Sequence, residues 1–316
     1  MIKYYAKERG GILQELLHAQ RGCWINVYPP YNRQEINLLS EELDVPLDYF
    51  FDSLDIDERS RYEQEDGVQF IVLKIPIKNM VEDDSEPVYL TIPIGIIEVD
   101  DYILTISAFE NPVIDYFLTR NPREFESTDH SHFALLLFER TVFYFLHYLK
   151  FINNQRNLYE KELYNSSRNQ ELSKLMRLQK SLVYFVTTLR DNEMLMMRMQ
   201  RSNFLNIREK EEREDFFEAI IIDMQQAQDM ARIYTDILNS TMDSFASIIS
   251  NNLNSSMERL TTLTVILMAP TLVASFFGMN IPLPLTDKPL AFFYILFVSA
   301  LLVVFLVWFF RRKQMF

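Results

Sequence analysis

A Gly-Met-Asn tripeptide near the carboxyl end is the part of the chain best suited to binding chemistry. It occupies Gly278, Met279 and Asn280 and lies between two uncharged apolar runs, 260–277 and 290–310. A bilayer core of ~30 Å needs about 20 helical residues, so each run is predicted to cross a membrane, the first with help from its flanks. The tripeptide then falls at the turn of a membrane hairpin. Backbone carbonyls and an amide side chain at that point are groups that a pore mouth would present to a cation.

Basic residues predict how this hairpin is oriented. Arg259 precedes the first run and residues 311–313 are basic after the second, whereas the connecting loop carries only Lys288, beside Asp287. Because cytoplasmic flanks are enriched in Lys and Arg, we expect a multi-pass protein of the cell (inner) membrane with both termini in the cytoplasm. The first eleven residues contain no apolar stretch of signal length. The single cysteine, Cys23, excludes an internal disulfide and suits a reducing compartment.

The overall charge argues against one class of partner. The formal net charge is −13 at pH 7, and acidic residues cluster over 41–58 and 82–84. Because phosphate binding needs clustered Lys and Arg, no nucleic-acid partner is expected. Two interpretations of the acidic clusters stay open: a solvated surface that keeps the protein soluble, or a site for a cationic partner or ion.

Glycine and proline divide the chain into a mixed part and a helical part. Five of the six glycines lie at or before Gly95, the sixth is Gly278, and neither glycine nor proline occurs from 123 to 269. A stretch without either residue, rich in Leu, Glu, Gln, Met and Arg, predicts long helices. We therefore expect three parts: a cytoplasmic α/β domain over 1–127, a cytoplasmic helical region with a stalk helix over 128–256, and a transmembrane hairpin with a basic tail over 257–316.

Within the first part, short β-branched and aromatic segments separated by turn residues predict four strands. They cover 23–30, 67–79, 88–99 and 102–109. Residues 37–54 predict one helix, with Ser40 as its cap.

The segment 206–277 predicts one helix that passes from the cytoplasm into the membrane. Apolar residues at spacings of three and four give it an amphipathic face for packing on partner helices. This face consists of Met230, Tyr234, Ile237, Phe245, Ile248 and Leu253.

A second face of the same helix is polar or small. Steps of seven residues drift by only ~20° around a helix, so a heptad series forms one stripe. The stripe contains Asp229, Asp236, Asp243, Ser250, Met257, Thr264, Thr271 and Gly278, and Asn254, Met268 and Ser275 fall beside it.

Two interpretations of this stripe compete. Ser, Thr and Gly commonly line tight helix–helix contacts in membranes. Alternatively, several copies of the helix line a pore, since a single hairpin cannot enclose one. The continuation of the stripe into Asp243, Asp236 and Asp229 favours the pore, because aspartates on an inward face serve a cation path and not apolar packing.

These features resemble a known family. Two terminal spans with APTLVASFFGMN at the end of the first, the long region without glycine or proline, and the basic tail are similar to the CorA family of magnesium channels. Two further segments, 45–77 and 178–199, look like that family's amino-terminal domain and helical region. The resemblance covers most of the chain and is weak before about residue 35.

The resemblance implies a membrane homopentamer with an α/β cytoplasmic domain, a funnel of long helices and a two-helix transmembrane hairpin. It implies Mg²⁺ as transported and regulatory ion, with no organic cofactor, and passive uptake gated by intracellular Mg²⁺. The resemblance also implies that Gly278, Met279 and Asn280 determine ion selectivity. It implies that Asp243 is a regulatory cation ligand, and the second ligand is Glu82, Asp83 or Asp84. The implied pore-lining positions are Asn254, Met257, Leu260, Met268, Thr271, Ser275 and Gly278.

One departure from the family concerns the entrance. Relatives often carry Met-Pro-Glu-Leu after the motif, whereas this loop reads IPLPLTDKPL and its one acid, Asp287, adjoins Lys288. Transport of Zn²⁺, Co²⁺ or Ni²⁺ therefore stays open as an alternative. A zinc-transporting branch usually has Ile at the position of Met279, which favours magnesium.

Other function classes have less support. The sequence has no P-loop, glycine-rich nucleotide fingerprint, HExxH or CxxC, so neither an enzyme nor an ATP-driven pump is expected. His130 and His132 start a predicted helix, where this spacing points their rings apart, which disfavours a metal pair. A membrane-tethered scaffold or sensor that conducts nothing remains an alternative, but it needs neither the stripe nor the tripeptide.

Overall fold

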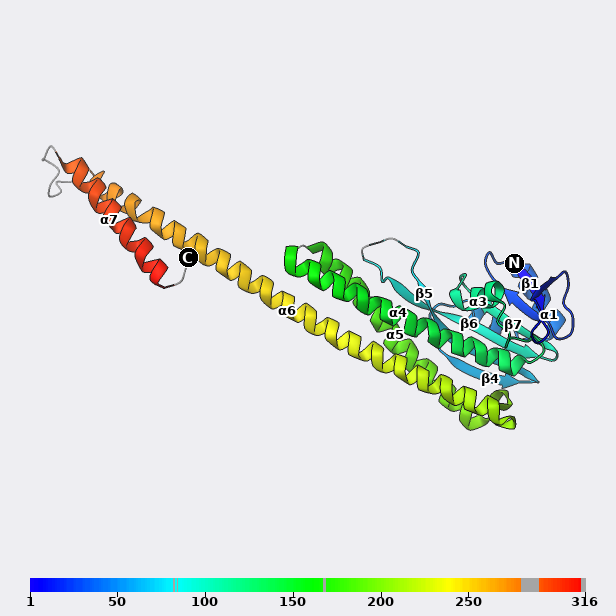
Figure 1. Ribbon diagram of the computed structural model, residues 1–316. Coiled ribbons are helices and arrows are strands. Elements are labelled where there is room, and N and C mark those ends of the chain that lie inside the picture. The colour runs from blue at the N-terminus through cyan, green and yellow to red at the C-terminus, as the bar shows by residue number, and fades with distance from the viewer. Residues whose placement is uncertain (82, 84, 167–168, 280–289, 314–316) are drawn as a thin grey trace. The chain divides into compact units, whose positions relative to one another are not determined.

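The computed structural model describes the whole chain except residues 82, 84, 167–168, 280–289 and 314–316 (Figure 1). Its backbone contacts divide it into two compact units, Met1–Thr241 and Met242–Phe316. The boundary falls within the longest helix, so each unit is described by itself.

The first unit is built on a seven-stranded sheet of order β2-β1-β3-β7-β6-β5-β4. All neighbouring strands pair antiparallel except β3 and β7, which are parallel, with Asn26 opposite Thr105 and Val27 opposite Ile106. The strands are β1 (Ile2–Ala6), β2 (Gln14–Leu16), β3 (Trp24–Val27), β4 (Arg61–Glu65), β5 (Val68–Lys78), β6 (Tyr89–Val99) and β7 (Tyr102–Ser107).

The four predicted strands are confirmed. β5 and β6 are nearly continuous apolar runs, and most of their residues are buried on both faces of the sheet, as expected for strands covered by helices on each side. β1, β2 and β4 were not predicted from the sequence. β4 reads RYEQE and is polar throughout, which suits an edge strand that must not pair with another chain.

The single helix predicted over 37–54 is wrong, because the segment forms two helices, α1 (Arg33–Leu43) and α2 (Leu47–Asp52). Asn32 caps α1 by accepting a hydrogen bond from the Gln34 N–H at 3.0 Å. Ser40 is therefore not an N-terminal cap. It lies inside the helix, and its hydroxyl donates to the Val45 carbonyl at 2.6 Å.

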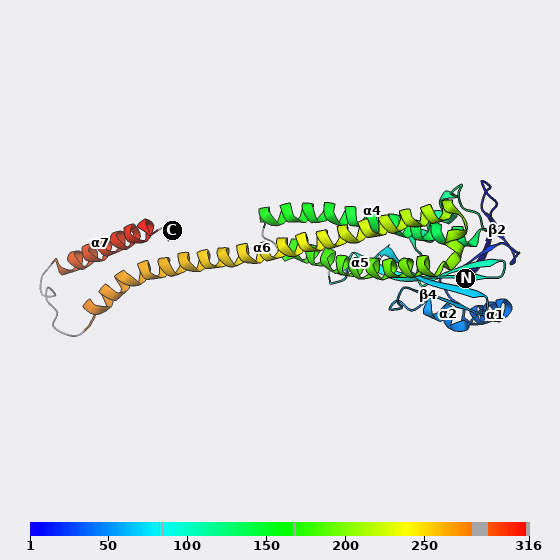
Figure 2. The same cartoon turned by 90° about the horizontal axis from the view of Figure 1, so that it is seen from below.

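Helices cover both faces of this sheet. In Figure 2, α1 and α2 lie on one side of it, and α4 (His130–Ser166) and α5 (Asn169–Ser202) lie on the other. α3 (Pro112–Arg120) follows β7 and packs against α4. The side chain of Asn192 on α5 is fully buried and pairs with both backbone groups of Lys74, which ties the helical layer to β5.

The long helix α6 runs from Glu211 to Phe277, later than the predicted start at 206. Leu205 and Asn206 adopt left-handed backbone angles, with φ of 61° and 50°, so a short 3-10 segment (Phe204–Glu209) precedes it. In the first unit α6 buries a line of residues of which none was predicted for packing. This line consists of Phe217, Ile220, Met224, Ala227, Ala231 and Leu238.

The second unit holds the remainder of α6 and α7 (Ala291–Arg312). Both helices contain a segment long and apolar enough to cross a membrane, and the candidate span in α7 is Phe292–Arg312. The side chains of α7 are predominantly apolar and largely exposed within the chain, as expected for a lipid-facing helix.

Candidate ion pathway

The aspartates of the stripe lie opposite the face that packs within the first unit. Asp229 and Asp236 are exposed, whereas Ala231 and Leu238, two residues after each, are fully buried. Two residues correspond to about 200° around a helix, so each aspartate points away from the packed face. Within the first unit, therefore, neither carboxylate is covered by the helices of its own chain.

The same relation recurs at the start of the second unit. Asp243 is exposed and Phe245, two residues later, is only 3 % exposed. Beyond this point the predicted pore-lining positions Asn254, Met257, Leu260 and Met268 are all exposed in the isolated chain. Three of these are apolar, and a contiguous exposed apolar surface is typical of a contact with a membrane or with another protein chain.

Two threonines of the stripe donate hydrogen bonds from their hydroxyl groups to backbone carbonyls of the same helix. Thr264 donates to the Leu260 carbonyl at 2.8 Å, and Thr271 donates to the Leu267 carbonyl at 3.0 Å. A hydroxyl whose proton is used in this way has acceptor lone pairs left to offer. Such oxygens match the water shell of a hydrated cation, whose outward groups are hydrogen-bond donors.

The motif begins where α6 ends. The Gly278 N–H donates to the Ala274 carbonyl at 3.0 Å, and the Met279 N–H donates to the Phe276 carbonyl at 3.3 Å. Ser275 lies one turn earlier and is exposed. Asn280 lies outside the described residues, as do Asp287 and Lys288.

In the part of the chain that the structure describes, no contact requires a glycine at position 278. Its backbone is not left-handed, and a Cβ added there would lie 3.4 Å from the Ala274 oxygen and 3.6 Å from the Ser275 oxygen, which is ordinary contact. The packing of the described residues therefore gives no reason for a glycine at this position.

Of the three acids considered as partners of Asp243, only Asp83 is described. Its carboxylate accepts a hydrogen bond from the Ser85 N–H at 2.8 Å, and this bond holds the pKa of Asp83 below its usual value. Glu82 and Asp84 lie outside the described residues. In the part of the chain that the structure describes, no three His, Cys, Asp or Glu side chains gather closely enough to hold a metal ion.

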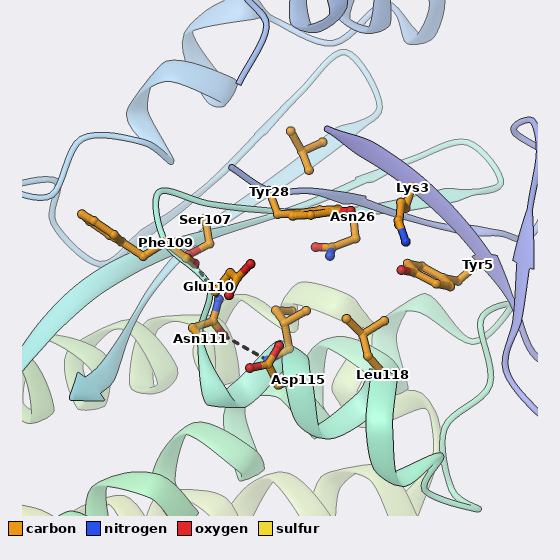
Figure 3. A pocket seen from close by; sticks show the side chains of 12 residues that line it. Lys3, Tyr5, Asn26, Tyr28, Ser107, Phe109, Glu110, Asn111, Asp115 and Leu118 are labelled. Atoms are coloured by element: carbon orange, nitrogen blue, oxygen red, sulfur yellow. Dashed lines mark hydrogen bonds between the residues drawn. The ribbon is translucent and has the colours of Figure 1, made fainter. Parts of the chain in front are cut away.

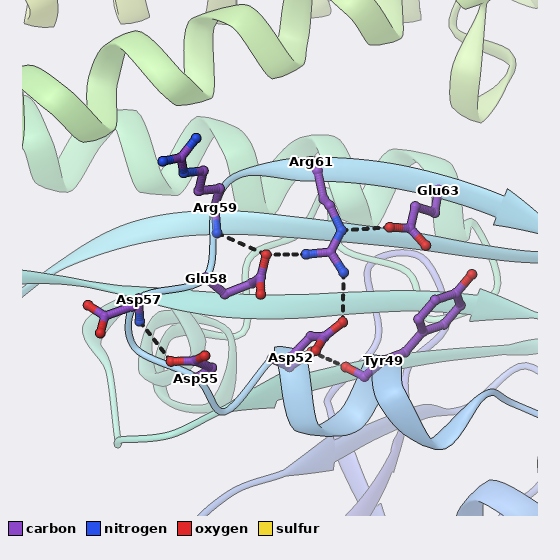
Figure 4. A network of polar contacts seen from close by, with 9 residues as sticks. Tyr49, Asp52, Asp55, Asp57, Glu58, Arg59, Arg61 and Glu63 are labelled. Atoms are coloured by element: carbon purple, nitrogen blue, oxygen red, sulfur yellow. Dashed lines mark hydrogen bonds and ion pairs between the residues drawn. The ribbon is translucent and has the colours of Figure 1, made fainter.

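The larger acidic cluster is compensated in part within the chain. Arg61 binds three carboxylates, those of Asp52 at 2.7 Å, Glu63 at 2.6 Å and Glu58 (Figure 4). This ion-pair network places a cation of the protein itself among the acids. It favours a structural role for this end of the cluster over a site for a bound ion.

His130 and His132 are distant in sequence from the residues of the stripe, and each contacts side chains of the first unit. α4 starts at His130, as predicted, and the His130 Nδ1 atom lies 3.5 Å from Glu98 Oε1 on β6. The ring of His132 packs on Phe216, with 5.8 Å between centroids, and burial lowers its pKa.

Comparison with known proteins identifies the family. The profile described as "CorA-like Mg2+ transporter protein" matches residues 19–312, nearly the whole chain. The chain belongs to the CorA-like Mg²⁺ transporter family. A curated relative, the cobalt/magnesium transport protein CorA of Methanocaldococcus jannaschii, is 27% identical over 312 residues, which cover 93% of this chain and 91% of the relative.

Solved structures show the same fold. The complete CorA magnesium transporter of M. jannaschii superposes with a TM-score of 0.81 at 24% identity, covering 99% of this chain and 98% of that one. The full-length CmaX protein gives 0.71 at 13% identity, covering 99% and 97%. The cytoplasmic ZntB domain of Vibrio parahaemolyticus gives 0.58 at 12% identity, covering 80% and 97%. The predicted architecture, an α/β domain followed by long helices and two apolar terminal helices, is thus confirmed, and the chain is a two-span membrane protein of this family.

Proposed function

We propose that the chain is one subunit of a pentameric channel that passes Mg²⁺ through a pore lined by five copies of α6. The exposed stripe carries this proposal. It runs on the face opposite the packed residues at Asp229, Asp236 and Asp243, and its heptad spacing continues in the sequence to Gly278. Other copies of the chain can pack against such a face. Membership of the CorA-like family indicates that the transported ion is Mg²⁺.

Gly278, Met279 and Asn280 would form the selectivity ring. Mg²⁺ dehydrates reluctantly, so a selective ring can recognise the ion together with its water shell. Amide oxygens and backbone carbonyls accept hydrogen bonds from that shell without adding charge. Carboxylates at the same place would bind the ion more tightly and slow its release, which conduction cannot tolerate.

Below the ring, the pore-lining residues would be of two kinds, polar and apolar, with different roles. Ser275, Thr271 and Asn254 offer oxygen acceptors to a hydrated ion, whereas Met268, Leu260 and Met257 form apolar constrictions that close by dewetting. Movement of the helices that widens these constrictions would admit water and open the path.

Asp243 would sense the intracellular ion. Five carboxylates around a symmetry axis repel one another, and bound Mg²⁺ relieves the repulsion and holds the stalks together. Loss of the ion at low Mg²⁺ frees the subunits to separate, which shifts the population toward the open channel. Its partner would be one of Glu82, Asp83 and Asp84 on a neighbouring subunit.

In this arrangement residues 1–127 and 128–256 lie in the cytoplasm and 257–316 form the membrane hairpin. Both termini face the cytoplasm, since Arg259 and the basic residues 311–313 flank the spans. Flux would be passive and inward, because a negative interior drives a divalent ion with about 4.6 kcal/mol per 100 mV.

Ion flux into liposomes tests the proposal. Purified protein is reconstituted with a fluorescent Mg²⁺ indicator inside the vesicles, and an inward-directed potential is applied. We expect Mg²⁺ entry, and native mass spectrometry in gentle detergents should give five copies. Entry of Zn²⁺ without Mg²⁺ would move the assignment to the zinc alternative. If an intact pentamer passes no divalent ion, the result would favour the non-conducting scaffold. A stable monomer or dimer would contradict the proposed pore.

A further inference from the structure

A pocket in the α/β domain lies apart from the ion pathway. It opens where the parallel strands β3 and β7 end, beside the first turn of α3, and has a volume of about 160 Å³ (Figure 3). Crevices at the carboxyl ends of parallel strands are preferred ligand sites in α/β proteins. A space of this size suits a small organic ligand rather than a nucleotide.

The floor of the pocket holds an amide with an unused donor group. Asn26 is only 4 % exposed, and its Oδ1 accepts a hydrogen bond from the Thr105 hydroxyl at 2.9 Å. Thr105 in turn accepts from the Trp24 indole N–H at 2.8 Å. The Thr105 hydroxyl thus accepts from the indole and donates its own proton to Asn26, so the amide oxygen faces Thr105. Its NH₂ group lines the pocket and makes no hydrogen bond to any described residue.

A cation lies beside this amide. Lys3 of β1 is the direct cross-strand neighbour of Asn26, so both side chains lie on the same face of the sheet. Its ammonium pairs with Glu15 at 3.1 Å and has further donors available. The sheet side of the pocket therefore offers donors to an anion or a carbonyl.

The opposite wall is acidic. Glu110 precedes α3 and Asp115 lies in its first turn, and both side chains line the pocket from the helix side (Figure 3). Neither carboxylate forms an ion pair with any residue in the described part of the chain. Between the two polar walls lie the side chains of Ile114 and Leu118 and the ring of Tyr28.

From this arrangement we propose that the pocket binds a small aliphatic α-amino acid. The carboxylate of the ligand accepts hydrogen bonds from Asn26 and Lys3, its ammonium group faces Glu110 and Asp115, and its side chain packs on the apolar wall. A ligand with only one charge would leave one of the two walls without a partner, which costs binding energy. The proposal concerns binding in the α/β domain and does not depend on conduction.

Ligand-observed NMR and calorimetry on the full-length protein in detergent test this site. The probes are L-valine, isobutylamine and 3-methylbutanoate, of which the last two are valine without its carboxylate and without its amine. L-Alanine and L-leucine extend the series in size. We expect L-valine to bind, and isobutylamine and 3-methylbutanoate each to bind at least tenfold more weakly than L-valine.

Two variants locate the binding. Asp115→Asn keeps the shape of this first-turn side chain and removes one acid, and we expect it to lower affinity for the amino acid at least tenfold. Asp48→Asn makes the same change in the first turn of α2, away from the pocket, and should leave affinity unchanged. Absence of binding by all three amino acids, equal binding of isobutylamine, or equal loss in both variants would overturn the proposal.

Discussion

Arg213, near the start of α6, donates from one guanidinium nitrogen to both carboxylate oxygens of Asp129, at 2.9 and 3.2 Å. The same carboxylate accepts a hydrogen bond from the His132 N–H at 3.1 Å in the first turn of α4. One side chain thus joins the beginnings of two long helices. Because the Arg213 side chain is only 9% exposed, its charge depends on this partner.

Asp129→Asn should separate the two roles of this residue. The amide oxygen still accepts from His132, but the charge that compensates Arg213 is lost. We expect the free energy of unfolding to fall by about 1–3 kcal/mol, measured as a lower thermal transition of the purified protein. Asp101→Asn is the matched control, since its pair with Arg21 is 3.6 Å long and both side chains are largely exposed. Equal shifts in the two variants would show that the Asp129 pair is not special.

Gly278→Ala should impair conduction without harming the fold. Its Cβ fits the isolated chain at ordinary distances, so yield and thermal stability should match the wild type, while five added methyl groups at the pore mouth lower Mg²⁺ flux at least tenfold. Gly95→Ala is the contrasting variant, because its Cβ would lie 1.8 Å from the Ser53 hydroxyl oxygen. That variant should lose about 1–3 kcal/mol of stability. Normal Mg²⁺ flux through the Gly278→Ala variant would show that Gly278 does not line the ion path.

Asn280→Ala tests the selectivity ring. We expect Mg²⁺ uptake to be abolished with the pentamer intact, since the variant loses the acceptors for the water shell. Asn280→Asp should also slow uptake, because a ring of carboxylates holds the ion too tightly to release it. Asn251→Ala changes an exposed amide of α6 outside the stripe and should conduct normally. Wild-type uptake by Asn280→Ala would make the motif a structural turn only.

The proposed amino-acid site should depend on pH. Burial, and to a lesser degree the charge of Glu110, raise the pKa of Asp115 above its usual value. The ligand's ammonium needs the ionised carboxylate, so affinity should fall as the pH drops through this raised pKa. The loss should begin at a higher pH than for an ordinary aspartate of pKa about 3.9. Titrations with L-valine from pH 7 to 4 measure this, and Asp115→Asn should show a weaker dependence over that range.

Local features of the sequence were enough to predict much of the fold. The absence of glycine and proline over 123–269 indicated long helices, and the apolar runs of β5 and β6 indicated buried strands. The break between α1 and α2 was missed because Asp44 closes α1 in a left-handed conformation that glycine usually adopts. β4 was missed because its polar residues lack the alternation of a half-buried strand.

Features that depend on contacts between distant segments were not predictable in this way. The packed line of α6 includes Ala227 and Ala231, small residues that allow close approach but add little to an apolar pattern. The pocket depends on the parallel pairing of β3 with β7, which joins segments about 80 residues apart. By contrast, the seven-residue spacing was enough to predict that Asp229, Asp236 and Asp243 share one face of a helix. This follows from the helical repeat alone and needs no contact with distant segments.

Asp243→Ala tests whether this stripe senses intracellular Mg²⁺. If ions between subunits hold the stalks together, millimolar Mg²⁺ should slow proteolysis of the cytoplasmic region in the wild type. The variant should lose at least part of this protection, because the proposed ligand is absent while the exposed position tolerates alanine. Glu218→Ala, an exposed acid of α6 outside the stripe, should behave as the wild type. An identical dependence on Mg²⁺ in all three proteins would mean that Asp243 is only a solvated residue of the helix surface, and gating would then have to use other ligands.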